Sequence, residues 1–402
     1  MKTTCIFIAL LFVVSTVKAQ KVQELASKNI DEAIPMFEQI SDFKNTDEVK
    51  LVGLGDIGEF AKETKKFNTA FSAYLITKKK FRNIVLQTDD WLLRPLNIYL
   101  TTAVPADNAR LDSLIKNIFS GHHKFANPEF SSLIKWIKNY NLSHPDDMVN
   151  IGGVAPYTQI PPSYLLSAYV FPVDKSYGQK LSEKWSDNAT PDSTAYSDIK
   201  TWIEALKNTK LSKLNQNLIF KCNEDLIHNT FVLKVESADQ KFPLKVLNDR
   251  SRYIANQILK KLSKKTIYYG LNTEIIKANL ESNFTKDNLP SFSVGKLLSE
   301  ELKEKYYVFI TDFANVAKLP VADLSAQKMN VEVFTGSAQA KTLFEKKDYF
   351  ERKKDKDVLT GYKPMVISYI KGQFTNAIVQ RDSFAADALF LFSHLSEIDL
   401  NY

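Results

Sequence analysis

Polar side chains follow two apolar runs in the first quarter of the chain, where an α/β sheet protein would present them to a ligand. Residues 51–55 and 83–86 are apolar enough to form buried strands. The polar side chains that come next are Asp56, Glu59 and Glu63 after the first run, and Gln87 after the second. Because the carboxyl ends of parallel strands face the ligand crevice, these residues form a candidate site for proton transfer or cation binding.

No histidine accompanies these residues, and its absence limits the chemistry that they can perform. A general base works best with a pKa near the ambient pH, which suits neutral histidine. Glu59 could accept a proton, although a free glutamate has a pKa of about 4.3. We expect Glu59 and Glu63 to lie on one helix face, where Glu63 and Asp56 would raise the pKa of Glu59, since like charges disfavour ionisation.

Two kinds of cofactor site can be weighed on these residues. The carboxylates that could surround a divalent cation are Asp56, Glu59, Glu63 and Glu274. A solvated acidic pocket balanced by Arg250 is the simpler interpretation. The dinucleotide-binding string G-x-G-x-x-G occurs at 53–58, yet Gln87 stands where the ribose of a dinucleotide needs an acidic residue. We therefore predict no metal and no cofactor.

The positions of apolar residues predict strands that alternate with helices. Strands are expected at residues 51–56, 83–87, 149–151, 265–269, 306–310, 331–334 and 388–392. Helices are expected at residues 61–78, 91–100, 130–137, 198–206, 213–222, 249–262 and 294–304, and within 20–47, with a polar connector at 186–197. This order predicts an α/β fold with a mainly parallel central sheet, helices on both faces, and a helical cap or insertion near residues 156–262.

The composition is that of a soluble globular protein, with 402 residues of which 44% are hydrophobic and 25% charged. Residues 1–19 read as a signal peptide with cleavage after Ala19, which predicts a secreted or periplasmic protein whose mature domain is 20–402. No later run is long enough to span a bilayer. The formal charge of +7 forms no basic stripe interleaved with aromatic residues, so we predict no nucleic-acid partner. Export would leave Cys222 as the one cysteine, and we expect a buried structural thiol.

Several segments between about residue 40 and the end resemble the erythromycin esterase family and its relatives in their order and spacing. They are V-G-L-G-D-I-G-E at 52–59, F-R-N-I-V-L-Q-T-D at 81–89, W-I-K-N-Y-N at 136–141, the helix 249–256 and S-V-G-K-L-L at 293–298. The resemblance implies an α/β protein that hydrolyses an ester, which in the best-known members is a macrolide lactone. It also implies a histidine as general base on water, carboxylates that orient this histidine, and a second histidine in an H-N-x-H segment.

The chain departs from the family pattern at the positions that carry the chemistry. Glu59 stands in place of the motif histidine, and Gln87 in place of the glutamate that ends the second strand. Ala155 replaces an aspartate, and the segment L-N-T-E at 271–274 replaces H-N-x-H. The residues that keep something of the family chemistry are Asp56, Glu63, Arg250 and Asn272.

Catalytic groups that act as a unit are not additive, so these exchanges make the parental mechanism unworkable. We therefore predict an exported, catalytically degenerate erythromycin esterase-like protein that binds an unknown small molecule or envelope partner. Its candidate catalytic positions are Glu59, Glu63 and Arg250, and its candidate pocket residues are Asp56, Gln87, Asn272 and Glu274. Two alternatives stay open: an active ester or lactone hydrolase with a rebuilt carboxylate or metal site, and a purely structural envelope protein.

Overall fold

The structure is a computed structural model in two compact units, one formed by residues 1–155 and 243–402 and the other by residues 156–242. It describes residues 21–40, 48–119, 125–186, 191–236, 244–281, 291–323, 325–365, 367, 378–379 and 385–399. The predicted signal peptide and the adjacent histidines His122 and His123 lie outside the described residues. No described helix is both long enough and apolar enough to cross a bilayer.

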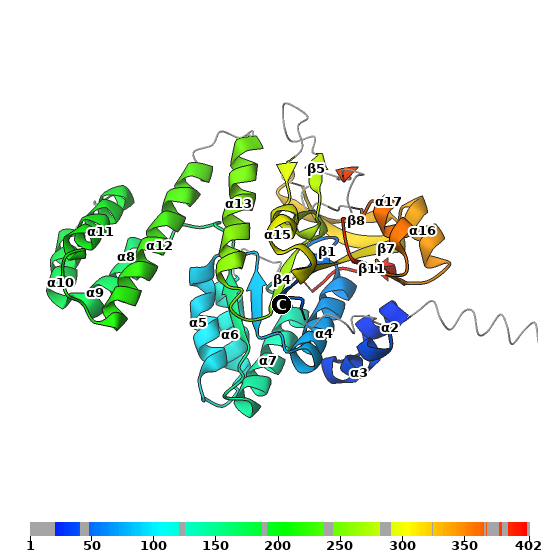
Figure 1. Ribbon diagram of the computed structural model, residues 1–402, viewed down its shortest axis with the longest axis horizontal. Coiled ribbons are helices and arrows are strands. Elements are labelled where there is room, and N and C mark those ends of the chain that lie inside the picture. The colour runs from blue at the N-terminus through cyan, green and yellow to red at the C-terminus, as the bar shows by residue number, and fades with distance from the viewer. Residues whose placement is uncertain are drawn as a thin grey trace, which may run out of the picture. The chain divides into compact units, whose positions relative to one another are not determined.

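A mainly parallel sheet forms the centre of the first unit (Figure 1). Its strand order is β3-β2-β4-β1-β7-β11-β9, with β8 paired to β7. The strands are β1 (Leu51–Asp56), β2 (Asn83–Leu86), β3 (Asn150–Gly153), β4 (Thr266–Leu271), β7 (Tyr306–Asp323), β8 (Lys328–Thr335), β9 (Tyr349–Glu351) and β11 (Ala388–Leu395). Only β8 and β9 among them run antiparallel to their neighbours. The predicted α/β fold with a mainly parallel sheet is confirmed.

The middle strands are buried on both faces, which explains why they read as continuous apolar runs. Every residue of β1 is buried, and Leu54 lies opposite Tyr269 of β4 and Phe309 of β7. The same register places Asp56 opposite Leu271, where β4 ends. Polar residues that follow these strands are thereby gathered along one edge of the sheet.

Helices cover both faces of this sheet. One face packs against α2 (Lys21–Ser27), α3 (Ile30–Ile40), α4 (Lys62–Lys79), α5 (Asp90–Thr101), α6 (Asn108–Ile118) and α7 (Pro128–Ser143). The other packs against α13 (Leu244–Lys260), α14 (Asn272–Ile275), α15 (Val294–Leu302), α16 (Ala338–Phe344) and α17 (Lys356–Gly361). On the first face, Phe37, Phe67 and Phe71 contact one another and reach Phe390 of β11. Such aromatic packing supplies much of the apolar burial that holds helices on a sheet.

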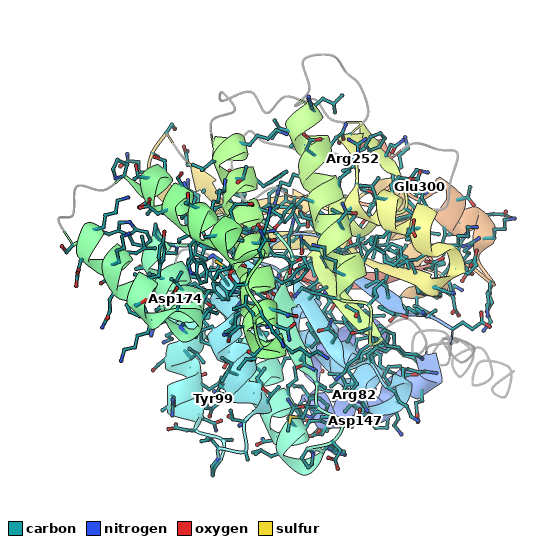
Figure 2. All side chains as sticks on the ribbon, turned by 60° about the vertical axis from the view of Figure 1, so that its left-hand side comes forward. Arg82, Tyr99, Asp147, Asp174, Arg252 and Glu300 are labelled. Carbon is teal, nitrogen blue, oxygen red and sulfur yellow. The ribbon has the colours of Figure 1, made fainter. Side chains whose placement is uncertain are left out.

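Local signals fix where several of these elements begin and end. Asn127 caps α7 by accepting a hydrogen bond from the Phe130 amide at 2.8 Å, and Pro128 occupies the first turn, where proline is favoured. Lys80 ends α4 in the left-handed region at φ 60. Arg82 then donates to Asp147 at 2.6 Å, and the two side chains lie side by side in Figure 2. This ion pair ties the start of β2 to the turn before β3.

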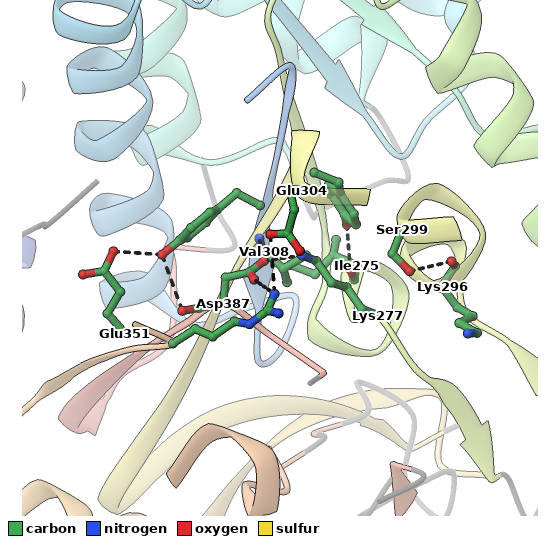
Figure 3. A network of polar contacts seen from close by, with 11 residues as sticks. Ile275, Lys277, Lys296, Ser299, Glu304, Val308, Glu351 and Asp387 are labelled. Atoms are coloured by element: carbon green, nitrogen blue, oxygen red, sulfur yellow. Dashed lines mark hydrogen bonds and ion pairs between the residues drawn. The ribbon is translucent and has the colours of Figure 1, made fainter. Parts of the chain in front are cut away.

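Polar contacts also join the amino ends of β7 and β11 (Figure 3). They lie at the edge of the sheet opposite the one where β1 and β4 end. Asp387 accepts hydrogen bonds from the Val308 amide at 2.8 Å, and Lys277 Nζ lies 2.6 Å from the same carboxylate. Arg352 is 3.3 Å from its other oxygen. Because Asp387 and Lys277 are buried and paired, this contact joins the last strand firmly to the middle of the sheet.

β7 differs most from its predicted extent, since it continues from Tyr306 to Asp323 instead of ending near residue 310. Its first residues pair with β1 and its last with β8, which takes up the pairing after β1 has ended. A small antiparallel sheet is formed separately by β5 (Asn279–Glu281), β6 (Ser291–Phe292) and β10 (Ile378–Val379). The short helix η3 (Lys303–Lys305) precedes β7.

The second unit is helical in its described part. It contains α8 (Pro162–Leu165), the π-helical turn η2 (Leu166–Val170), α9 (Phe171–Val173), α10 (Lys175–Lys184), α11 (Asp192–Leu206) and α12 (Lys213–Glu236). Two sequence predictions were wrong here: α11 begins inside the expected polar connector, and α12 runs well past residue 222. The helix α13, which the sequence analysis counted in the insertion, belongs to the first unit. Cys222 is buried, as expected.

Candidate functional site

Two of the predicted pocket residues meet where β2 and β4 end. The amide of Gln87 donates to one carboxylate oxygen of Glu274. The other oxygen accepts a hydrogen bond from the Leu271 amide at 3.0 Å, which caps α14. β2 and β4 are neighbours in the sheet, so the strand order brings these residues together. The result is an amide–carboxylate pair with one negative charge. A glutamate at position 87, as in the family motif, would bring a second.

The side chain of Asn272 is hydrogen-bonded to the backbone of β7. Its Nδ2 donates to the Thr311 carbonyl at 2.6 Å, and its Oδ1 accepts from the Thr311 amide at 3.2 Å. The side chain therefore extends the hydrogen bonding of the sheet past the end of β4. A Cβ atom at Gly55 would overlap Asn272 Oδ1 and lie 2.9 Å from Ile275 Cδ1, so only glycine fits there.

Asp56 is held in a buried ion pair that sequence reasoning missed. Its Oδ2 lies 2.5 Å from Lys65 Nζ, and both side chains are less than a tenth exposed. Its Oδ1 accepts hydrogen bonds from Thr64 Oγ1 at 2.7 Å and from the Gly58 amide at 3.3 Å. The ammonium neutralises the carboxylate, and Oδ2 has no further hydrogen-bond donor among the described residues. Asp56 thus stabilises the junction of β1 and α4.

Glu63 binds the segment that follows β11. Its two oxygens accept from the Ser396 amide at 2.7 Å and from the Ser396 hydroxyl at 2.6 Å. Glu59 lies in the turn before α4, which begins at Lys62. The expectation that Glu59 and Glu63 share a helix face was therefore wrong, because the chain turns instead of starting the helix directly after β1.

The predicted acidic residues do not form a metal site. Among the described residues, which include all four candidate carboxylates, no three His, Cys, Asp or Glu side chains are grouped so as to hold a metal ion. Arg250 lies on α13, on the opposite face of the sheet from α4 with its Asp56–Lys65 pair. The sheet itself therefore stands between the helix of Arg250 and the helix of Glu63.

The described histidines of the first unit belong to segments other than β1, β2 and β4 and are exposed. His144 follows α7 and is exposed, and His394 is exposed on β11. His228 belongs to the second unit, where its Nε2 lies 2.9 Å from the Thr158 carbonyl oxygen. The segments of the first unit that directly follow β1, β2 and β4 contain no histidine that could deprotonate water.

Asp312 is a buried acidic group whose pKa is raised toward neutrality, and it is not among the site residues proposed from the sequence. It is fully buried on β7, where its Oδ2 accepts from the Tyr362 hydroxyl at 2.7 Å and from the Met365 amide at 2.9 Å. Burial raises the pKa of Asp312 from 3.8 to about 6, although these hydrogen bonds oppose the rise. The strand was expected to end before this residue, which is why it was missed.

Tyr269 occupies the α4 side of β4 and is equally enclosed. Its hydroxyl lies 2.6 Å from Ser72 Oγ and donates to the Asn68 carbonyl at 2.9 Å. Burial, assisted by the charge of Asp56, raises the pKa of this phenol well above its ordinary value. The tyrosine is therefore a neutral hydrogen-bonding group and not an acid that titrates near neutral pH.

A hollow of about 450 Å³ lies on the first unit between α5 and α6. Its wall is formed largely by apolar side chains, including Pro95, Ile98, Tyr99, Val104 and Leu114, and Arg110 also lines it. Its volume falls within the range of small-molecule sites, which is roughly 300–1,000 Å³. No residue proposed from the sequence lines it.

Comparison with solved structures shows which scaffold this geometry belongs to. A protein from Bacillus cereus superimposes with a TM-score of 0.70 at 16% identity, over 95% of this chain and 98% of that one. A succinoglycan biosynthesis protein gives 0.66 at 14% identity, over 96% and 99%. A histidine-to-asparagine mutant of the erythromycin esterase EreC, in its open conformation, gives 0.60 at 16% identity, over 90% and 94%.

These likenesses show that the fold is erythromycin esterase-like. No protein-family model matches the chain, and no curated protein matches it either. The predicted resemblance is thus supported at the level of the fold. Function has to be argued from this chain's own residues.

Proposed function

We propose that the chain is an exported, catalytically degenerate protein on an erythromycin esterase-like scaffold, and that it binds a ligand or an envelope partner. The observation that carries the proposal is the Asp56–Lys65 ion pair. When the segment 52–59 is set against the motif of the esterase family, Asp56 occupies the position of an acid that helps to activate water. Here a buried ammonium 2.5 Å away neutralises that acid.

The neighbouring positions support the same conclusion. A general base needs a free lone pair directed at the attacking water. Both oxygens of Glu63 accept hydrogen bonds from Ser396, and Gln87 cannot ionise at all. The groups that would act together in hydrolysis are instead engaged in contacts that stabilise the fold. Loss of several such groups at once removes most of the rate.

Hydrolysis assays test the degenerate assignment. The chain from Gln20 onward is incubated with activated esters and macrolide lactones, with and without divalent cations, beside an active erythromycin esterase as positive control. We expect the same background rate for the wild-type chain and for Glu59→Gln. Turnover above background that Glu59→Gln abolishes would overturn the proposal and support a rebuilt carboxylate site.

One observation favours an active hydrolase as a second candidate. Burial raises the pKa of Asp312 to about 6, the range in which a carboxylate serves as a general base near neutral pH. If the chain hydrolyses esters through Asp312, Asp312→Asn should abolish turnover while Glu59→Gln leaves it intact. The Asp312 carboxylate is already enclosed by Tyr362 and Met365, which is why we rank this candidate second.

Export is tested separately by expressing the full chain in a Gram-negative host. We expect the protein in the periplasm or medium, with Gln20 as its first residue. A chain that keeps its first nineteen residues and stays in the cytoplasm would contradict export, yet would leave the assignment of the site unaffected.

Thermal-shift screening against macrolides and envelope metabolites then tests binding. A ligand present at about one hundred times its Kd stabilises the folded state by about 2.7 kcal/mol, a shift that such screens detect. If the protein is purely structural, none of these compounds should cause a saturable shift in Tm.

A further inference from the structure

The strand β8 has one edge that no described strand covers. It pairs with residues 316–323 of β7, and its other side has no partner strand in the described part of the chain. Residues 316 and 317 of β7 pair with β11 on one side and with β8 on the other. β8 therefore lies on the same side of β7 as β1, beyond the residue where β1 ends. A free edge of this kind presents backbone N–H and C=O groups that can recruit another strand.

The side chains of β8 make this edge unusually apolar. Met329, Val331 and Val333 alternate along one face and are 42%, 53% and 65% exposed. Proteins commonly protect an edge strand with a central lysine, a proline or a bulge. The centre of β8 contains none of these, because its lysine, Lys328, stands at the end of the strand.

One hydrogen bond fixes which residues of β8 direct their backbone groups outward. The Gly336 amide donates to the Asn315 carbonyl at 2.9 Å, so this pair is hydrogen-bonded across the hairpin. Hydrogen-bonded and non-hydrogen-bonded pairs alternate along an antiparallel ladder. The uninterrupted register therefore turns the N–H and C=O groups of Val331 away from β7. Pro320 of β7 lies opposite Val331 in a non-hydrogen-bonded pair. Since residues of such a pair donate no N–H group to each other, the missing N–H of proline costs no hydrogen bond to β8.

The sequence of β8 is complementary to itself. When two copies are set antiparallel with Asn330 opposite Asn330, Lys328 of each copy lies opposite Glu332 of the other. Met329 then lies opposite Val331. In this register the outward groups of Met329 and Val331 hydrogen-bond across the junction, and the charged pairs fall at the closely spaced positions where side chains interact best.

We propose that β8 pairs with β8 of a second copy of this chain, antiparallel and centred on Asn330, so that one sheet continues through a two-fold dimer. A two-fold interface uses the same patch on both subunits, which is what a self-complementary strand provides. The proposal concerns the edge of the sheet and is independent of the function proposed for the strand ends.

Charge reversal tests the register. Sedimentation velocity over a concentration series gives the dimer Kd of the wild-type chain, of Lys328→Glu and of Glu332→Lys. Each reversal sets two like-charged pairs in contact and should weaken the dimer by about tenfold or more. The double reversal Lys328→Glu with Glu332→Lys restores both pairs and should restore the Kd. Lys305→Glu, an exposed lysine just before β7, is the matched control and should leave the Kd unchanged.

A disulfide gives a second, independent measurement. In the proposed register Asn330 lies opposite Asn330 of the second copy in a non-hydrogen-bonded pair. The two Cβ atoms of such a pair are close enough for a disulfide. Asn330→Cys should therefore form a covalent dimer under mild oxidation. Val333→Cys should not, because six residues at about 3.3 Å each would separate the two thiols. Cys222 is buried and does not compete.

Three results would overturn the proposal. They are a chain that stays monomeric throughout the concentration series, a dimer whose Kd ignores both single reversals, and a double reversal that fails to recover the wild-type Kd. Circular dichroism spectra of the variants show whether each retains the fold, so that a loss of dimer is assigned to the interface.

Discussion

Replacement of Lys65 by methionine should cost the protein much of its stability. Methionine keeps the length and the apolar character of the lysine stem but leaves Asp56 as an uncompensated charge in a site where both side chains are less than a tenth exposed. Removal of one partner from a buried ion pair typically costs about 3–5 kcal/mol. For a unit of this size, each kcal/mol corresponds to about 2 °C in Tm, so Lys65→Met should lower Tm by roughly 6–10 °C.

The double variant Asp56→Asn with Lys65→Met is the matched comparison. Asparagine keeps an oxygen for the Thr64 hydroxyl, which donates to Asp56 at 2.7 Å, but brings no charge. A buried ion pair replaced as a whole is often neutral for stability, so the double variant should unfold within about 1 kcal/mol of wild type. Urea unfolding followed by circular dichroism measures both. A single variant as stable as wild type, or a double variant as unstable as the single, would refute the assignment of Lys65 as the counter-charge of Asp56.

Three further predictions follow from buried groups. Asp312 keeps its proton in the folded state up to about pH 6, whereas the unfolded chain loses it near pH 3.8, so the free energy of unfolding should fall by on the order of 3 kcal/mol as pH rises through that window. Asp312→Asn should flatten this part of the urea-stability profile, and an unchanged slope would show that another group is responsible. Burial, with the charge of Asp225, raises the pKa of the Cys222 thiol to about 12, so labelling by a thiol reagent at pH 8 should require denaturant; rapid labelling of the native chain would contradict this. Gln87→Glu sets two carboxylates in contact at Glu274 and should lower stability by about 1–3 kcal/mol at pH 8, as thermal denaturation beside the wild-type chain would reveal; an unchanged Tm would contradict the contact.

The parallel core could be predicted because strands buried on both faces leave a simple pattern. The runs that became β1, β2 and β4 are short, apolar and followed by polar residues, and the helices between them start at recognisable caps such as Asn127. β7 was harder, because its second half has Pro320 and exposed positions such as Lys318, which are typical of an edge rather than of a buried strand.

The candidate site was predicted in its residue types but not in its contacts. Gln87 and Glu274 meet because their strands are neighbours, a relation that strand order decides and local sequence does not reveal. Lys65 lies on α4, where a lysine is usually solvated, and only the folded chain brings it onto Asp56. One local signal was available: residues 67–76, which follow Lys65 closely, contain no charged side chain, so a helix buried along this length would need a partner for the lysine.

The position of β11 in the sheet has a consequence for biosynthesis. The strand is formed by some of the last residues of the chain, yet it lies between β7 and β9 and carries the Asp387 contact with Lys277 at its start. The sheet can therefore close only after residues 388–395 have been synthesised, since β7 lacks a neighbour on that side until then.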